Sequence, residues 1–111
     1  MSIIKSLPTQ KRINGIITNA SDTAIVSERD YRTSGEDCIV VKGVPVCNLT
    51  LDSSTTEHTV VKCMTKVIII PDTGLIDEEY DEIVADKGAC IEFRCVEKNW
   101  YILSSDGLKF S

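Results

Sequence analysis

A dense group of carboxylates lies in residues 73–93, which read TGLIDEEYDEIVADKGACIEF. Six of them fall between positions 77 and 86: Asp77, Glu78, Glu79, Asp81, Glu82 and Asp86. A glycosidase needs two carboxylates across a substrate, with the pKa of one raised by an apolar pocket. Aromatic residues make up 5% of the chain, so no aromatic cleft is expected around these acids. A Ca²⁺ loop needs oxygen ligands on alternate residues and a turn glycine, a register that DEEYDEIVADKG lacks. We expect a hydrated surface, with an opportunistic cation site as the alternative.

Nucleophilic catalysis would depend on His58, the only histidine, which lies in the polar sequence TTEHT and is expected to contact solvent. A Cys–His pair using Cys47 or Cys63 would also need an orienting group and an oxyanion hole. The sequence has no nucleophile-elbow motif, no G-x-x-x-x-G-K-[ST] and no G-x-G-x-x-G. We therefore expect a protein that is not an enzyme, with no catalytic residue and no cofactor.

The thiols do not form a metal-binding pattern. The five cysteines are Cys38, Cys47, Cys63, Cys90 and Cys95. No C-x-x-C pair occurs, whereas structural zinc sites use two closely spaced pairs. Most of these cysteines lie among Ile, Val and Leu, where a thiol behaves as a small hydrophobe. We expect buried free thiols, a reducing compartment during folding and no bound metal.

Trp100 and Tyr101 are the one aromatic pair in the sequence. Adjacent residues of a strand point to opposite faces, so one ring is expected in the core and the other outside it. We expect Trp100 to fill the core, and a sugar-stacking platform is the alternative.

Charge is divided unevenly along the chain of 111 residues, whose formal net charge is −5. Residues 1–21 contain Lys5, Lys11 and Arg12 and no acid, whereas residues 22–111 hold all 17 acidic residues. An acidic body repels phosphate backbones, so nucleic-acid binding is not expected. The basic segment suggests a contact with an acidic partner, and a solvated tail is the alternative. No apolar run approaches the roughly 20 residues of a membrane-spanning helix, and the N-terminus lacks a secretory h-region. We expect synthesis in the cytoplasm and no membrane contact.

The elements that must position these residues have a period of two, which is typical of strands. Strands are predicted at residues 23–28, 37–43, 46–52, 59–70, 89–96 and 100–105, with a last short one at 108–110. The twelve-residue stretch 59–70 is long for one strand, so a break near residues 64–66 is expected. The sequences DSSTTEH (52–58), PDTG (71–74) and EKN (97–99) are typical of turns.

Residues 75–87 fit two structures. Ile76, Tyr80, Ile83, Val84 and Lys87 have helical spacing, with acids in the first turn and Gly88 as a C-cap. A strand, a turn at DEEYD and a returning strand at EIVA fit as well.

The order of these pieces resembles a β-sandwich module that recurs in virion proteins of tailed bacteriophages, especially head and tail fibres. The matching elements are residues 37–41, 48–51, 60–62, 67–71, 76–77, 88–93 and 99–102. The family often has Gly after the I-D step, where this chain has Glu78. The resemblance favours strand–turn–strand for residues 75–87, and it implies no active-site residues.

We therefore predict an all-β fold: a small β-sandwich or jelly-roll-like domain of seven or eight short antiparallel strands (21–111), preceded by an extended N-terminal arm (1–20). The resemblance implies a virion structural protein, most simply a capsid decoration protein that binds the major capsid protein or other virion proteins. Lys5, Lys11 and Arg12 are the predicted partner-binding residues. A homo-oligomer is expected, and a trimer is one form it could take. The alternatives are a tail or fibre component that binds a host receptor through loops 52–58 or 97–99, and a small β-fold hydrolase.

Overall fold

The structure, a computed structural model, describes residues 10–13, 16–19 and 22–107, and for residues 10–13 and 16–19 it describes the backbone alone. Every regular element in this part of the chain is a strand, so the predicted all-β class is confirmed. The strands are β1 (Gln10–Ile13), β2 (Ile16–Asn19), β3 (Thr23–Val26), β4 (Asp30–Arg32), β5 (Cys38–Val41), β6 (Val46–Leu51), β7 (His58–Cys63), β8 (Lys66–Pro71), β9 (Ile83–Ala85), β10 (Cys90–Val96) and β11 (Asn99–Asp106).

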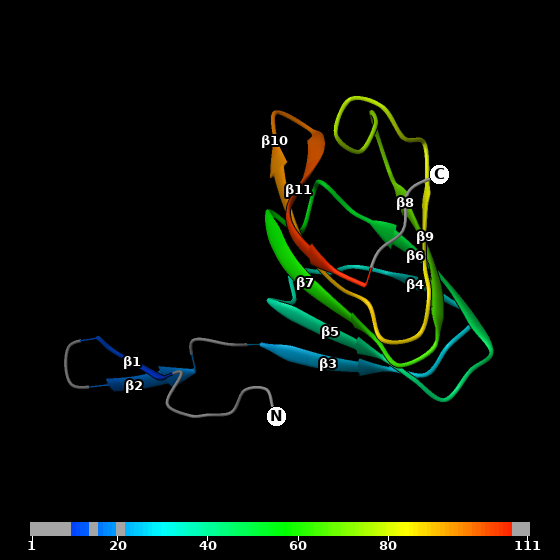
Figure 1. Cartoon of the computed structure of the whole chain (residues 1–111). Coiled ribbons are helices and arrows are strands. Elements are labelled where there is room, and N and C mark those ends of the chain that lie inside the picture. The colour runs from blue at the N-terminus through cyan, green and yellow to red at the C-terminus, as the bar shows by residue number, and fades with distance from the viewer. Residues whose placement is uncertain (1–9, 14–15, 20–21, 108–111) are drawn as a thin grey trace.

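Two sheets face each other and enclose the core (Figure 1). One has five strands in the order β11-β10-β7-β5-β3, and the other has four in the order β4-β6-β8-β9. Within the described residues, β1 and β2 pair with each other and with no other strand, as an antiparallel hairpin. These are the two layers of the predicted small sandwich, with nine strands where seven or eight were predicted. β1, β2 and β4 are strands that sequence reasoning missed.

From β3 to β8 the chain winds as a flat coil, because successive strands alternate between the two sheets. β3, β5 and β7 pair in parallel within one sheet, and β4, β6 and β8 pair in parallel within the other. Each connection between parallel neighbours thus crosses the opposite sheet, as in a short β-solenoid. After β8 the chain reverses, and β9, β10 and β11 add in antiparallel fashion.

The prediction of antiparallel strands throughout is therefore wrong for the whole coil. The parallel order also departs from a jelly roll, which is built from antiparallel Greek keys. The physical reason is that an alternating pattern fixes which side chains point inward but carries no information about strand direction. Parallel neighbours need crossovers of a dozen or more residues, and the three-residue strand β4 lies inside one of these crossovers.

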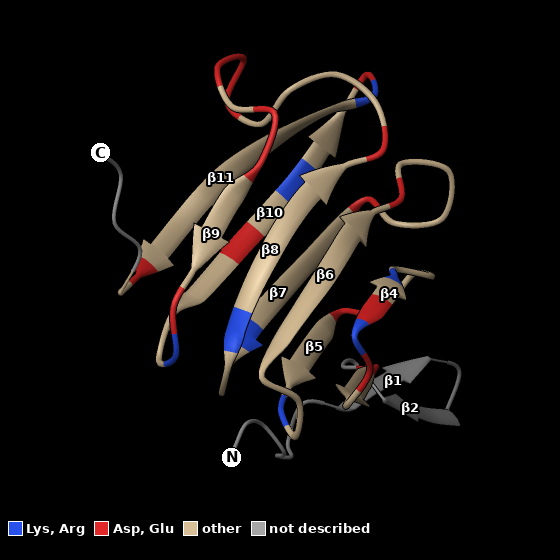
Figure 2. Ribbon diagram, turned by 90° about the vertical axis from the view of Figure 1, so that its right-hand side faces the viewer, with Lys and Arg blue, Asp and Glu red and all other residues tan. Residues whose placement is uncertain are grey.

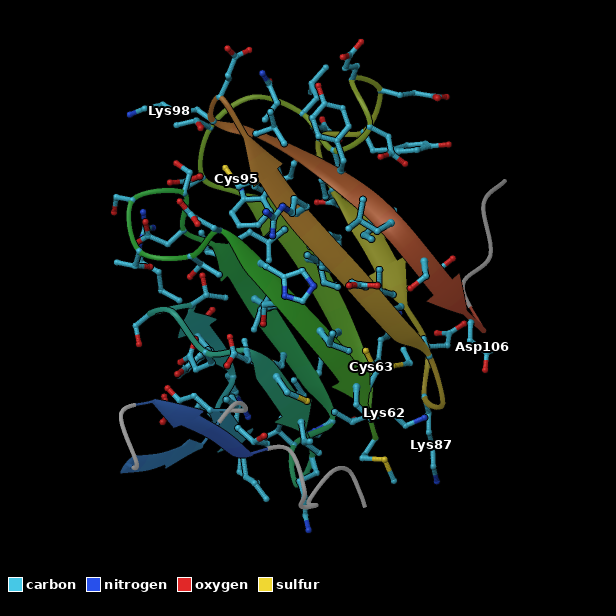
Figure 3. The ribbon with its side chains drawn as sticks, turned by 90° about the vertical axis from the view of Figure 1, so that its left-hand side faces the viewer. Lys62, Cys63, Lys87, Cys95, Lys98 and Asp106 are labelled. Atoms are coloured by element: carbon cyan, nitrogen blue, oxygen red, sulfur yellow. The ribbon has the colours of Figure 1, made fainter. Side chains whose placement is uncertain are left out.

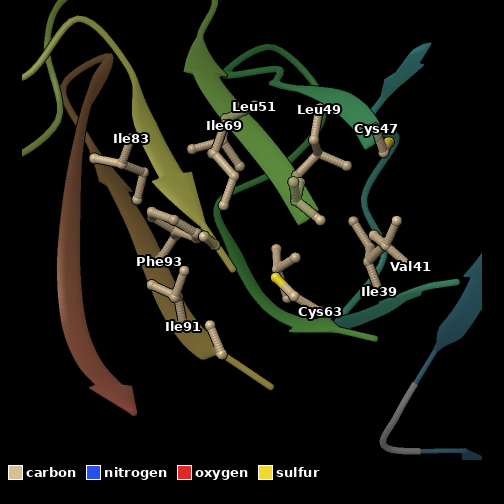
Figure 4. Packing of buried hydrophobic residues seen from close by; sticks show 14 of the residues in the cluster. Ile39, Val41, Cys47, Leu49, Leu51, Cys63, Ile69, Ile83, Ile91 and Phe93 are labelled. Carbon is tan, nitrogen blue, oxygen red and sulfur yellow. The ribbon is translucent and has the colours of Figure 1, made fainter. Parts of the chain in front are cut away.

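The inward faces of both sheets supply a continuous aliphatic core (Figure 4). Leu51, Val67 and Phe93 have no exposed surface, and neither has Trp100, which was expected in the core. On β6 every second residue is buried, beginning with Cys47, as the alternation predicts. The expected break in 59–70 lies between β7 and β8, at Met64 and Thr65.

Residues 75–87 form no helix. Ile76 and Tyr80 close a tight turn through an isolated β-bridge, and β9 follows. The predicted turn and returning strand are therefore present, whereas Ile76 lies in a bridge and not in a strand. Asp77 and Glu78 have φ of 55° and 59°, a conformation in which glycine or asparagine is usual. Glu78 thus stands at the position where the resemblance leads one to expect glycine.

The predicted arm, residues 1–20, contains β1 and β2, but Lys5 and residues 108–110 lie outside the described residues. The boundary between arm and sandwich stays a prediction. Among the described residues, no helix is long and apolar enough to cross a membrane.

Candidate binding site

An open hollow of about 450 Å³ lies where loops 33–37 and 52–57 meet the end of the five-stranded sheet. His58 of β7 and Arg94 of β10 face it from paired positions on neighbouring strands. Four consecutive hydroxyl residues, 53–56, form much of its wall. The predicted polar turn 52–58 is thus one side of the hollow, and residues from β10 and the β4–β5 loop complete it.

Buried threonines hold the two loops together. Thr56 Oγ1 donates to Thr33 Oγ1 at 2.9 Å, and Thr33 Oγ1 accepts the Asp52 N–H at 2.8 Å. Thr55 Oγ1 donates to the Thr33 carbonyl at 2.9 Å. Gly35 has a φ of 95°, and its N–H donates to Thr56 Oγ1 at 3.0 Å. Satisfied buried polar groups of this kind fix a single loop arrangement.

Asp52 anchors the wall by accepting three hydrogen bonds. The donors are Ser54 Oγ at 2.6 Å, Ser54 N–H at 2.8 Å and Arg32 Nε at 2.7 Å. The Ser54 hydroxyl, the Arg32 guanidinium and the Ser54 N–H together lower the pKa of Asp52 to about 2. Asp72 Oδ2 likewise accepts hydrogen bonds from the Ser53 N–H and the Ser53 hydroxyl, both at 3.0 Å. The protons of these serine hydroxyls are therefore already donated within the protein.

The Asp52 anchor makes the stability of the protein sensitive to acid. Because the folded-state pKa lies below the unfolded value, its contribution is present above about pH 4 and is lost as the pH falls towards 2. We expect Asp52→Asn to destabilise the protein at pH 7 and to flatten the loss of stability between pH 4 and pH 2. Urea titrations at several pH values measure this, with the exposed Asp81→Asn as the matched control. Equal pH profiles for the wild type and Asp52→Asn would contradict the assignment.

His58 does not simply face solvent, as its polar sequence context suggested. Its Nε2 lies 2.6 Å from Glu92 Oε2, and both side chains are 33% exposed. The hydrogen bond to His58, followed by one from Ser104, lowers the pKa of Glu92. The alternation of β10 places Glu92 on the outer face, but its closeness to His58 depends on the pairing of β10 with β7, which the sequence does not specify.

A histidine oriented by a glutamate resembles the base of a hydrolase, but within the described part of the chain no activated nucleophile lies beside it. The hydroxyls of Ser53 and Ser54 donate to carboxylates, and those of Thr55 and Thr56 donate to Thr33. Among the lining residues, Glu57 and Arg94 have side chains without a hydrogen bond or ion pair to the described residues. Asp37 and these two side chains therefore offer acceptors and a donor to a polar ligand.

A second hollow, of about 460 Å³, crosses the outer face of the four-stranded sheet over β4 and β6. Its charged groups are already paired, because Asp30 accepts from Asn48 Nδ2 at 3.3 Å and Arg32 donates to Asp52. The second hollow therefore has fewer unpaired polar groups for a ligand than the first, so the first hollow is the better candidate.

The acidic stretch serves the fold. It projects from the end of the sandwich as the loop between β8 and β9 (Figure 2). Asp77 Oδ1 accepts the Ile102 N–H at 2.9 Å, and Glu78 Oε2 accepts the Tyr101 hydroxyl at 2.8 Å. Asp81 and Glu82 are exposed, as a hydrated surface requires. No group of three or more potential metal ligands occurs among the described residues.

The thiols are all free, but only Cys47 and Cys63 are buried, whereas the other three are partly exposed. The expectation of buried thiols therefore holds for these two. Burial raises the pKa of Cys63 to about 12 and also raises the pKa of Cys47. Both are protonated at neutral pH and are poor nucleophiles. Trp100 fills the core as expected, and Tyr101 lies outside it.

Of the predicted partner-binding residues, Lys11 and Arg12 lie on β1, where only the backbone is described. They are adjacent in the chain and face Thr18 and Ile17 of β2. Among the described residues that line the hollow, Arg94 is the single basic side chain besides histidine. The chain matches no protein-family model, and no curated protein is recognisably similar to it.

Proposed function

We propose that this protein is a non-enzymatic structural component of a tailed-bacteriophage virion, a capsid decoration protein that binds the major capsid protein or a neighbouring virion protein. The observation that carries the proposal is the separation of charge along the chain. Residues 1–21 have three basic and no acidic residues, and the remainder carries all 17 acids. The basic segment then docks on an acidic partner surface, while the acidic sandwich faces outward and stays soluble.

The two-sheet body supports a structural role. Its core is continuous, its loop hydroxyls donate to protein acceptors, and its buried thiols are protonated. A rigid module without an activated nucleophile suits display on a particle better than it suits catalysis. The hydrolase alternative has the weakest support, since the His58–Glu92 pair has no reactive hydroxyl beside it.

The N-terminal segment provides the decisive test. We expect deletion of residues 1–20 to abolish association with purified particles and to leave the β-rich circular dichroism of the body unchanged. The sharper variant is Lys11→Glu with Arg12→Glu, which reverses the charge of the segment. The matched control is Lys87→Glu with Lys98→Glu, an equal change in charge at exposed sites at opposite ends of the body (Figure 3). Association that survives both arm changes would contradict the proposal.

The hollow favours a second candidate, a tail or fibre component that binds a host saccharide. Carboxylates, a guanidinium and an imidazole around about 450 Å³ suit a ligand rich in hydroxyl groups. Quantitative mass spectrometry of purified virions separates the candidates. Decoration predicts copies in proportion to the major capsid protein, and a tail component predicts only a few per particle. Absence from the particle would contradict both.

A further inference from the structure

The ends of the sheets are the places where another strand can add. An edge strand presents unpaired N–H and C=O groups, and natural proteins shorten it, charge it or cover it. Four strands are edges here: β3 and β11 in one sheet, and β4 and β9 in the other. β4 and β9 have three residues each, and β4 contains two charges. These two edges are therefore poor templates for pairing.

The edge of β11 is covered by the acidic loop. The Asp77 N–H donates to the Trp100 carbonyl at 2.8 Å, and the Trp100 N–H donates to the Leu75 carbonyl at 3.3 Å. The Asp77 carboxylate then accepts the Ile102 N–H. Further along, a shift in register between Glu92 and Phe93 makes the pairing of β10 with β11 irregular. Loop 75–77 thus occupies the positions that an added strand would need.

The edge of β3, a strand of four residues, differs from the other edges at Ile25. It reads TAIV, with no charge and no proline, and Ile25 is 65% exposed. Asp22 and Val26 accept hydrogen bonds from Cys38 and Lys42, so alternate residues of this strand face β5. In a parallel ladder, the N–H and C=O of Ile25 then point away from β5. Among the described residues, no strand pairs on that side.

In the described part of the chain, the β1–β2 hairpin lacks a further strand that would stabilise it. It is a separate two-stranded sheet in this structure, and such a hairpin is only marginally stable in water without a further strand or a packing surface. It contains Lys11 and Arg12, whereas Asp22 and Glu28 flank β3 in the sequence. The charges of the hairpin and of the residues that flank β3 are therefore complementary. The hairpin needs a further strand to stabilise it, and the edge of β3 has backbone groups that can pair with one.

We propose that the β1–β2 hairpin of one copy of this chain adds to the β3 edge of a second copy. Only residues 20–22 separate β2 from β3, which is too short for a parallel pairing within one chain. An antiparallel return within one chain is short enough, yet the hairpin stays a sheet of its own in the single chain. Reciprocal exchange between copies covers the β3 edge of each copy and closes the assembly as a small symmetric oligomer.

Two substitutions at one position test the edge directly. Ile25→Pro removes an N–H that the β3–β5 ladder does not use, and proline is accepted at such outward positions of edge strands. Ile25→Thr is the matched control, because it removes the exposed aliphatic side chain and keeps the N–H. Light scattering coupled to size-exclusion chromatography is expected to show an oligomer for the wild type and for Ile25→Thr, and a monomer for Ile25→Pro. Circular dichroism checks that each variant is folded, and Ile25→Lys replaces Ile25→Pro if the proline unfolds the chain.

A mixing experiment tests the exchange itself. The full-length variant Arg12→Pro with Ile17→Pro breaks a directly paired position of the hairpin and leaves the β3 edge intact. This variant and Ile25→Pro are each expected to be monomeric alone and to form a one-to-one complex when mixed. A wild type that stays monomeric at all concentrations, an oligomer that survives Ile25→Pro, or a mixture that forms no complex would overturn the inference. These outcomes need no virion, so they are independent of whether the proposed decoration function holds.

Discussion

Trp100→Ala is expected to lower the free energy of unfolding by about 3–5 kcal/mol, the largest effect of any single change considered for this protein. The indole has no exposed surface, and it lies on β11 beside the bridge from Ile76 that ties the acidic loop to the sheet. Its removal leaves a cavity that the surrounding strands cannot fill without breaking their ladders. Chemical denaturation monitored by far-ultraviolet circular dichroism measures the change.

Trp100→Phe is the matched control. The indole Nε1 is buried without a hydrogen-bond partner among the described residues, and an unpaired buried donor costs roughly 1–3 kcal/mol. Phenylalanine removes that donor and leaves a smaller cavity than alanine does, so the net change is expected to stay within about 1 kcal/mol. A loss as large as that of Trp100→Ala would contradict the view that the ring contributes through packing alone.

Ile76→Ala is expected to cost about 2–5 kcal/mol although the residue lies in a loop. Its side chain has no exposed surface, its N–H donates to the Tyr80 carbonyl at 2.8 Å, and it forms bridges to both Tyr80 and Trp100. The neighbouring Leu75 is 38% exposed, so Leu75→Ala is expected to change stability by about 0.5 kcal/mol or less. Equal effects at the two positions, measured by the same denaturation, would show that Ile76 does not anchor the loop.

Loosening this anchor has a second consequence. Loop 75–77 covers the edge of β11, so its release exposes a long strand to pairing with other chains. We therefore expect Ile76→Ala to aggregate more readily than Leu75→Ala on heating, as measured by light scattering. The carboxylate-rich stretch thus acts as a cover for a sheet edge, with its remaining acids in water.

Alternation in the sequence predicted most of the strands and their inward residues. The period of two in residues 46–52 agrees with the burial of Cys47, Leu49 and Leu51, and the break expected near residues 64–66 and the turn at residues 97–99 are both present. It missed β1 and β2, in the stretch predicted as an extended arm, and β4, whose three residues are too few to show a period. It also missed the parallel order, since that order depends on which strands become neighbours across long connections.

The candidate site was partly visible in the sequence. Loop 52–58 is polar and was a predicted contact loop, and it forms one wall of the hollow. The contribution of Arg94 and the pairing of His58 with Glu92 were not predictable, because they require β10 to lie beside β7. The bare edge at β3 was equally hidden, because an edge strand can be recognised only when the order of the sheet is known.

In the oligomer that we propose, a strand from another copy covers the edge of β3. The most direct measurement is hydrogen exchange at the amide of Ile25, followed by nuclear magnetic resonance over a range of protein concentrations. We expect protection of this amide in concentrated wild-type protein, with loss of protection on dilution and in the Arg12→Pro, Ile17→Pro variant. An exchange rate at Ile25 that is the same at every concentration would contradict it.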